Sequence, residues 1–471
     1  MIYMLLCACA ILYALFAYFF VKTYQLNGYN IGKFWGNCFA LNFSIGDKNK
    51  LVFTKRIIRF YIVLTAFVCL LSALPMLFVG NGFLAAFDVC VVFVLTPVWI
   101  TVVHYLILPL EILIKQYYII KAKNKLGKKN IVKIGITGSY GKTSTKNILT
   151  HILEKQYKVC ATPKNYNTEM GTTLTVLKHL DDHDVFIAEM GARKPRDIEK
   201  LTKNVNPDYA VITSIGNCHI ETFKTLENIE NTKFELAKFI KPEGVVFFGE
   251  SDSTYKLFKR FDGNKVLTCR DKSFAYAENV TVNQYGCEFD LIIDQQQTHV
   301  KTKLLGKFNI DNIVVASAVA YKLGIKLEDI KMAIKTLEPS PHRLELIQND
   351  YCSVLDDAYN SNEIGFKEAL KVLSKFEGRK IVVTPGMVEL GSKQSQINFA
   401  LGCMIADECD YLIIMNEVNK NDLLSGAISH GMKRENIYFA STRAQQSELV
   451  KLLTCKGAVV LFENDLPDNY S

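Results

Sequence analysis

Residues Ile131–Asn147 read IVKIGITGSYGKTSTKN, and this stretch decides the fold of the chain. Its first part, Ile131–Thr137, is a β-branched run of the kind that forms a buried strand. Gly138 and Gly141 then turn the chain, and the residues after them have helical composition. A strand, a glycine turn and a helix that begins with Lys-Thr can cradle phosphate groups, because the helix N-terminus offers free N–H groups and a partial positive charge.

The polar residues of this cradle have expected roles in nucleotide binding. Lys142 can reach the outer phosphates, and Thr143 supplies a hydroxyl to Mg²⁺. The motif is shorter than the usual G-x-x-x-x-G-K-[ST], whose first glycine would fall on Ile136. Gly-Lys-Thr in the correct place still favours nucleotide binding over an ordinary glycine turn. The residues expected to bind the ATP phosphates are Gly138, Ser139, Gly141, Lys142, Thr143 and Ser144.

The positive charge of the chain is concentrated in its first 133 residues. They carry 14 Lys and Arg against three acids, whereas the chain as a whole has a formal net charge of +8. Three uncharged runs lie in the same part, at Ile2–Val21, Phe60–Gly80 and about Val89–Leu110. Each is long enough to cross a bilayer as a helix. Three such runs favour a membrane domain over residues 1–125 rather than buried core helices or a nucleic-acid-binding surface.

The distribution of Lys and Arg predicts the orientation of this domain. Basic residues occur in a loop from Val21 to Arg59, between the first two runs, and again after the third run. The link between the second and third runs carries none. The positive-inside tendency places both basic regions in the cytoplasm and the N-terminus outside. We therefore expect a multi-pass membrane protein whose remaining residues lie in the cytosol, where ATP is available. The 13 cysteines form no C-x-x-C pair, which agrees with a reducing compartment.

The rest of the chain has an α/β pattern. Strand-length apolar segments alternate with helical ones, as in a parallel sheet covered on both faces. From Ala277 to Leu305 the apolar and polar residues alternate, as in a small antiparallel sheet. A second α/β unit begins near Pro339–Pro341. We predict transmembrane helices, then a central P-loop domain over residues 126–338 with a parallel and a small antiparallel sheet, then a C-terminal Rossmann-like domain over residues 339–471.

Further stretches follow the cradle in a fixed order. They are NYNTEMGTTLT (165–175), AEMGA (188–192), ITSIGNCHIETF (212–223), NTKFEL (231–236), LGKFNIDN (305–312), HRLE (342–345), LDDAYNSN (355–362) and GMVELG (386–391). In this order they resemble the Mur ligases, which build the stem peptides of bacterial peptidoglycan. The resemblance covers nearly all of the chain after residue 131, and is greatest to the members that add D-alanyl-D-alanine.

The resemblance implies an ATP- and Mg²⁺-dependent ligase. In this family a substrate carboxylate takes the γ-phosphoryl group of ATP, and an amine then displaces phosphate to give an amide. Thr143 and Glu189 resemble the ligands of one Mg²⁺, and His219 and Lys233 resemble the second-metal pair. An ammonium would repel Mg²⁺, but in the family this lysine is carbamylated and becomes an anion. The resemblance therefore implies a carbamate on Lys233. The alternative interpretation is that Lys233 is a solvated helix residue. Lys142, His219 and Lys233 are therefore the expected catalytic residues.

The remaining site residues follow from the same resemblance. Asn309 and Asn312 lie three residues apart, on one face of a helix, where the family places the adenine, although Asn309 could instead cap that helix. Arg343 and Asp357 resemble the residues that close on the phosphates and ribose. The residues expected to face the substrates are Asn165, Asn167, Tyr359, Asn360 and Asn362.

The expected function is a ligase anchored in the bacterial inner (cytoplasmic) membrane. Its implied reaction adds D-Ala-D-Ala to a muramyl tripeptide carried on UDP or on a lipid. Amide formation in another envelope polymer, such as a poly-γ-glutamate-like capsule, is the alternative ligase reaction. A P-loop ATPase that drives transport would need charged or strongly polar residues inside the apolar runs, where His104 is the only one among His, Lys, Arg, Asp, Glu, Asn and Gln.

Overall fold

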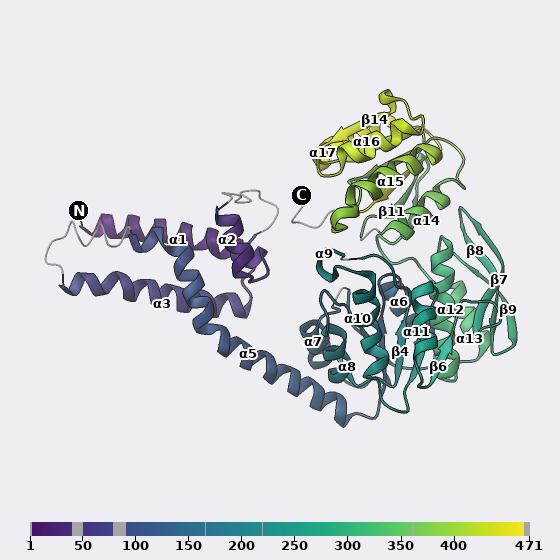
Figure 1. Cartoon of the computed structure of the whole chain (residues 1–471), viewed down its shortest axis with the longest axis horizontal. Coiled ribbons are helices and arrows are strands. Elements are labelled where there is room, and N and C mark those ends of the chain that lie inside the picture. Colours follow the sequence, from purple (N-terminus) through teal and green to yellow (C-terminus); the bar gives the residue numbers. More distant parts are fainter. Residues whose placement is uncertain are drawn as a thin grey trace. The chain divides into compact units, whose positions relative to one another are not determined.

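The computed structural model describes residues 2–39, 50–78, 91–164, 166–218, 220–359 and 362–465 (Figure 1). The chain divides into two compact units, Met1–Tyr118 and Ile119–Ser471. Helix α5 (Thr96–Lys128) begins in the first unit and ends in the second.

The first unit is helical. Its elements are α1 (Ile2–Leu26), α2 (Ile31–Phe39), α3 (Lys55–Phe78) and the first part of α5. Aromatic and aliphatic side chains such as Tyr24, Phe34 and Ile100 form its core. The basic loop expected between the first two apolar runs thus contains a helix, α2, whose Trp35 donates from Nε1 to the Thr101 hydroxyl at 3.0 Å.

Two helices of the described residues are long and apolar enough to cross a membrane, judged by length and composition alone. They are Lys55–Ala73 within α3, and Thr96–Lys128. Exposed side chains such as Ile62 and Leu106 make the outer faces of these helices apolar. The first expected run lies within α1, whose side chains at residues 2–10 and 12 are outside the described residues, as are residues 79–90, which include the end of the second run and the start of the third.

The second unit begins with a six-stranded parallel sheet in the order β2-β3-β1-β4-β5-β6. The strands are β1 (Val132–Thr137), β2 (Val159–Ala161), β3 (Val185–Glu189), β4 (Tyr209–Ile212), β5 (Val245–Phe248) and β6 (Lys265–Leu267). The helices between them are α6 (Lys142–Leu153), α7 (Glu169–His179), α8 (Asp197–Val205), α9 (Ile220–Phe223), α10 (Leu226–Lys238) and α11 (Asp252–Arg260). The parallel sheet predicted from the alternating segments is therefore confirmed.

Two hydrophobic cores lie on the two faces of this sheet, because successive strand residues point to opposite sides. On one face, Ile134 and Ile136 of β1 pack with α6 and with the helices α12 (Lys307–Lys322) and α13 (Leu327–Lys335). On the other face α7, α8 and α10 cover the sheet, and Ala122 and Leu126 from the end of α5 join that core. The sequence also predicts the small antiparallel sheet, which consists of β7 (Ala275–Asn283), β8 (Gly286–Ile293) and β9 (Gln296–Thr302).

The C-terminal part holds a second six-stranded sheet in the order β10-β11-β15-β12-β13-β14, in which only the pairing of β10 with β11 is antiparallel. Its strands are β10 (Glu345–Gln348), β11 (Cys352–Asp357), β12 (Lys380–Thr384), β13 (Tyr411–Met415), β14 (Ile437–Ala440) and β15 (Ala458–Glu463). Its helices are α14 (Glu363–Leu373), α15 (Gln394–Glu408), α16 (Lys420–Ser429) and α17 (Arg443–Leu453), with short 3-10 turns at Gly391–Lys393 and Arg434–Asn436.

Candidate active site

The glycine turn after β1 is closed so tightly that side chains are excluded from it. Gly138 has φ +155° and Gly141 has φ +78°. A Cβ atom at Gly138 would collide with the Thr213 hydroxyl, and one at Gly141 would collide with Oδ1 of Asn312. The Ser139 N–H donates to the Ser214 carbonyl at 2.7 Å, which ties the turn to the end of β4. The glycine turn therefore leaves the N-terminus of α6 free of side chains, and its backbone can approach phosphate oxygens closely.

Lys142 lies over this turn. Its ammonium donates to the carbonyl oxygens of Gly138 and Ser139, at 2.8 and 3.0 Å. Burial lowers the pKa of Lys142, although Glu189 counteracts this effect. The only polar partners that the described structure gives this ammonium are backbone carbonyls, which bound phosphate oxygens can replace.

Glu189, the last residue of β3, is the central acid of the site and is only 1% exposed. Its Oε2 accepts hydrogen bonds from Thr143 Oγ1 at 3.0 Å and from Lys146 Nζ at 3.1 Å. Its Oε1 accepts one from Asn167 Nδ2 at 3.2 Å. Burial alone would raise the pKa of Glu189, but Lys146 and Lys142 outweigh it and lower the pKa below the usual value. The carboxylate is therefore ionised.

The neighbouring Thr143 hydroxyl and Glu189 carboxylate fit Mg²⁺, which prefers hard oxygen ligands and shares its coordination sphere with water and nucleotide phosphates. The described residues hold no group of three or more His, Cys, Asp or Glu side chains that could bind a metal alone.

The expected second-metal pair is only partly described. Lys233 lies on α10 and is 2% exposed, so the reading of this lysine as a solvated helix residue is wrong. Burial, assisted by the nearby Lys142, lowers the pKa of Lys233 to about 8. His219 lies outside the described residues, and its pairing with Lys233 stays a prediction.

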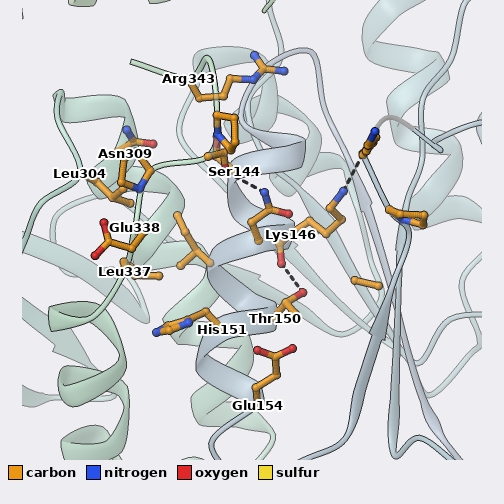
Figure 2. A pocket seen from close by; sticks show the side chains of 18 of the residues that line it. Ser144, Lys146, Thr150, His151, Glu154, Leu304, Asn309, Leu337, Glu338 and Arg343 are labelled. Carbon is orange, nitrogen blue, oxygen red and sulfur yellow. Dashed lines mark hydrogen bonds between the residues drawn. The ribbon is translucent and has the colours of Figure 1, made fainter. Parts of the chain in front are cut away.

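A cavity of about 490 Å³ lies beside α6. Its walls are the exposed side of α6, the loop after β2, and the segment 336–343 that leads into the C-terminal part. Figure 2 shows Ser144, Asn309 and Arg343 together at one end of this cavity, and His151 and Glu154 farther along α6. The cradle residue Ser144 thus shares a cavity with a residue expected at the adenine and with one expected at the phosphates.

The two asparagines of α12 have different surroundings. Asn309 lines the cavity, and its Nδ2 donates to the Leu305 carbonyl at 2.8 Å. Asn312 does not line it; its Oδ1 accepts from the buried Thr145 hydroxyl at 3.1 Å, so its amide supports the first turn of α6. Neither asparagine caps α12, whose N-cap is Gly306.

Arg343 and Asp357 come together at the start of the C-terminal part. The Arg343 guanidinium stacks over the Tyr359 ring, 4.3 Å from its centroid. Asp357 accepts a hydrogen bond from the Leu344 N–H at 3.1 Å. Burial raises the pKa of Asp357 above its usual range, against the opposing effect of Arg343. The electrostatic effect of Glu189 on Arg343 also opposes the lowering of the arginine's pKa by burial.

The residues expected to face the substrates differ in their contacts, and the structure describes only some of them. Asn167 contacts Glu189, whereas Asn362 caps α14 by accepting from the Gly365 N–H at 2.8 Å. Tyr359 is half-exposed beneath Arg343. Asn165 and Asn360 lie outside the described residues.

One residue of the site escaped the sequence analysis. Lys146 is buried beside Glu189. Its position four residues after Lys142 and three after Thr143, which puts all three on one side of α6, is the only feature of the sequence that could have predicted its place in the site.

Comparisons with known proteins agree with this geometry. The Mur ligase middle domain matches residues 136–320, and the Mur ligase glutamate ligase domain matches residues 342–463. The UDP-N-acetylmuramoyl-tripeptide--D-alanyl-D-alanine ligase of Buchnera aphidicola is 31% identical over 337 residues, which cover 70% of this chain and 72% of that protein. The ligase of the same name from Bacillus subtilis is 29% identical, with the same coverage of the two chains.

Two solved structures share the fold of this chain. The crystal structure of MurF ligase from Thermotoga maritima in complex with ADP superposes with a TM-score of 0.68 at 25% identity, over 74% of this chain and 80% of that one. Folylpolyglutamate synthase of Mycobacterium tuberculosis shares the fold, with a TM-score of 0.60 at 15% identity, over 76% of this chain and 95% of that one. The chain belongs to the Mur ligase family and is an ATP-dependent acid–amino-acid ligase.

Proposed function

We propose that this ligase adds D-Ala-D-Ala to a muramyl tripeptide and that it works at the bacterial cytoplasmic membrane. The observation that carries the proposal is the pairing of Thr143 with Glu189 beside the glycine cradle, in a chain whose relatives are named for this reaction. The alternative of a transport ATPase gives no account of the matched glutamate ligase domain.

The reaction begins with ATP bound across the N-terminus of α6. The N–H groups of the glycine turn and the Lys142 ammonium bind the phosphates, for which Lys142 exchanges its carbonyl partners. Arg343 approaches the same phosphates from the C-terminal part. Thr143 and Glu189 would hold Mg²⁺, which would neutralise negative charge on the phosphates. The positions of these residues orient the γ-phosphoryl group toward the substrate carboxylate.

Two bond exchanges then complete the amide. An oxygen of the tripeptide carboxylate attacks the γ-phosphorus, and the bond to the β-phosphate oxygen breaks, which gives an acyl phosphate and ADP. The free amine of D-Ala-D-Ala attacks the acyl carbon, phosphate leaves, and the amine loses a proton. Asn167, fixed beside Glu189, lies where the loop after β2 meets the phosphate site, which suits it to position the carboxylate.

We further propose that Lys233 carries a carbamate. Carbon dioxide reacts with a neutral amine, and the product loses a proton to become an anion that can bind a metal. Lys233 is buried on α10, and its lowered pKa leaves part of it as the free amine near neutral pH. The resemblance to the family's carbamylated lysine and the 14-residue spacing from His219 support the same assignment.

Membrane anchoring is the third element of the proposal. The helices Lys55–Ala73 and Thr96–Lys128 have the length and hydropathy of membrane spans, and their outer faces are apolar. Near the middle of α5 the side chain of Arg59 donates to the Glu111 carboxylate at 2.8 and 2.9 Å, which satisfies the one acid of that helix. Basic residues then follow on α5 as far as Lys128, and the positive-inside tendency places this end in the cytoplasm.

The test is phosphate release from ATP by the detergent-purified full chain. Muramyl tripeptide is supplied on UDP or on a polyprenyl carrier, with and without D-Ala-D-Ala, and Lys142→Ala serves as the inactive control. We expect release that requires both substrates and is lost in the control, and the better carrier identifies the natural donor. Phosphate release without either substrate, or no release with both while ATP still binds, would refute this reaction.

A further inference from the structure

The ammonium of Lys146 joins two parts of the site. Lys146 is 2% exposed and Glu189 is 1% exposed, so the pair is removed from water. The Lys146 ammonium contacts Glu189 Oε2 at 3.1 Å and donates to the Lys164 carbonyl at 3.0 Å. Lys164 belongs to the loop between β2 and α7, the β2–α7 loop. A single side chain thus connects α6, the metal carboxylate and this loop.

The β2–α7 loop is attached to the end of β3 at two further points. Asn167 donates from Nδ2 to Glu189 Oε1 at 3.2 Å, and its carbonyl accepts the Gly191 N–H at 2.8 Å. A Cβ atom at Gly191 would lie 2.7 Å from Cγ of Asn167, so the two segments are packed as closely as glycine allows. The β2–α7 loop is therefore attached to Glu189 and to the residues after it independently of Lys146.

Lys146 donates to the same Glu189 oxygen that a metal ion beside Thr143 would use. Glu189 Oε2 accepts from both Thr143 Oγ1 and Lys146 Nζ. A divalent cation placed between Thr143 and Glu189 would share that oxygen with the ammonium, and the two positive charges would repel each other in a water-poor site. Without the ion, the ammonium compensates the buried carboxylate, which would otherwise be costly to bury.

We propose that Lys146 is a positioning residue that links occupancy of the metal position to the β2–α7 loop. In the absence of Mg²⁺ it balances Glu189. When Mg²⁺ binds, the ammonium gives up part of its interaction with Oε2 and is held more strongly by the Lys164 carbonyl, which fixes the loop for the carboxylate substrate. Lys146 touches neither reacting atom. The proposal rests on the ATP-dependent ligase reaction, and only its substrate arm depends on the proposed tripeptide.

The first arm of the test measures metal binding without turnover. A fluorescent, non-hydrolysable ATP analogue is titrated onto the full chain in detergent at increasing Mg²⁺ concentration. Lys146→Met, which removes the charge, should lower the half-saturating Mg²⁺ concentration about tenfold, because the competing cation is gone. Lys146→Gln, which keeps a donor but not the charge, should lower it as well. Lys155→Met, an exposed lysine just after α6, is the matched control and should leave it unchanged.

The second arm measures the loop. In steady-state assays Lys146→Met should raise the KM of the muramyl substrate about tenfold or more, with a much smaller change in the KM of D-Ala-D-Ala. A residue that merely supports the fold would weaken Mg²⁺ binding and raise all KM values together.

The outcomes distinguish a failure of this proposal from a failure of the proposed reaction. An unchanged or higher half-saturating Mg²⁺ concentration in both Lys146 variants would overturn the proposal, as would an unchanged KM of the muramyl substrate. If Lys146→Met does not fold, Lys146→Gln decides the metal arm. A failure of the proposed reaction would appear differently, as wild-type protein that binds the Mg²⁺–nucleotide but releases no phosphate with the tripeptide and D-Ala-D-Ala.

Discussion

Replacing Gly141 by alanine should damage the phosphate cradle through one specific contact. Gly141 has φ +78°, in the left-handed region. A Cβ atom there would collide with Oδ1 of Asn312. Asn312 is buried and accepts the hydrogen bond of the Thr145 hydroxyl, so it cannot simply swing away. The collision is relieved only by breaking this hydrogen bond or by moving the first turn of α6.

The expected loss of stability has two parts. An alanine in the left-handed region costs about 1–2 kcal/mol. Breaking this hydrogen bond leaves the Thr145 hydroxyl and the Asn312 Oδ1 atom buried without their partner and costs about 1–3 kcal/mol. Gly141→Ala should therefore lower the free energy of unfolding by about 2–5 kcal/mol. Gly324→Ala is the matched control, because Gly324 has φ +91° with no atom within 4 Å of the added Cβ, and it should lose only the first part.

A double mutant isolates the contact. Asn312→Ala removes the colliding oxygen, so its cost in the Gly141→Ala background should be smaller than in the wild type by about 1–3 kcal/mol. Unfolding is followed by circular dichroism of the full chain in detergent, because both tryptophans, Trp35 and Trp99, lie in the first unit and would not report the ligase unit. Equal losses for Gly141→Ala and Gly324→Ala, or strictly additive costs, would refute the reasoning.

Three further predictions follow from the charged groups of the ligase unit. If Lys233 is carbamylated, activity should fall in CO₂-depleted buffer and return on addition of bicarbonate, whereas Lys233→Arg should be inactive in both; indifference of the wild type to bicarbonate would count against the carbamate. Arg343→Met should raise the KM for ATP about tenfold by removing a charge-assisted contact to phosphate, and an unchanged KM would place this arginine outside the nucleotide site. Burial raises the pKa of Asp311 to about 7, far above the ~3.9 of an unfolded aspartate, so the folded state keeps a proton that the unfolded state releases. This effect makes stability fall as pH rises from about 4 to about 7, and Asp311→Asn should unfold at a higher temperature than the wild type at pH 8 but not at pH 4.

The local parts of the site could be predicted from the sequence because short-range rules determine them. The run before Gly138 predicts β1, and the order Gly-Lys-Thr predicts the start of α6, since both depend on neighbours in the chain. The cap formed by Asn362 follows an equally local rule, because asparagine is common at the N-cap of a helix, where its side-chain oxygen accepts the N–H of the residue three positions later. The resemblance assigned it to the substrate, and the structure shows its side-chain oxygen bound to the backbone.

Contacts between distant segments could not be predicted in this way. The partner of Asn312 is Thr145, 167 positions away in the chain, and no pattern around either residue indicates the pair. Likewise, Lys146 is buried because the end of β3 brings Glu189 to it, and the periodicity of α6 shows only which side it occupies. The positions that the sequence left open are thus those whose surroundings are made by tertiary packing.

The cations of the site share one property that bears on how ATP binds. Lys142 is held by the carbonyl oxygens of Gly138 and Ser139, Lys146 by Glu189 and the Lys164 carbonyl, and the Arg343 guanidinium by the Tyr359 ring. Phosphate oxygens can replace the neutral partners of Lys142 and Arg343, whereas a metal ion can replace only the contact of Lys146 with Glu189 and leaves its bond to the Lys164 carbonyl in place. Binding of the nucleotide is therefore an exchange of partners between groups that are already in place, and little side-chain ordering remains to oppose it. Because the exchange brings charged phosphates to buried cations, which salt screens less than exposed pairs, the affinity for the Mg²⁺–nucleotide should depend on ionic strength less than binding by exposed lysines would.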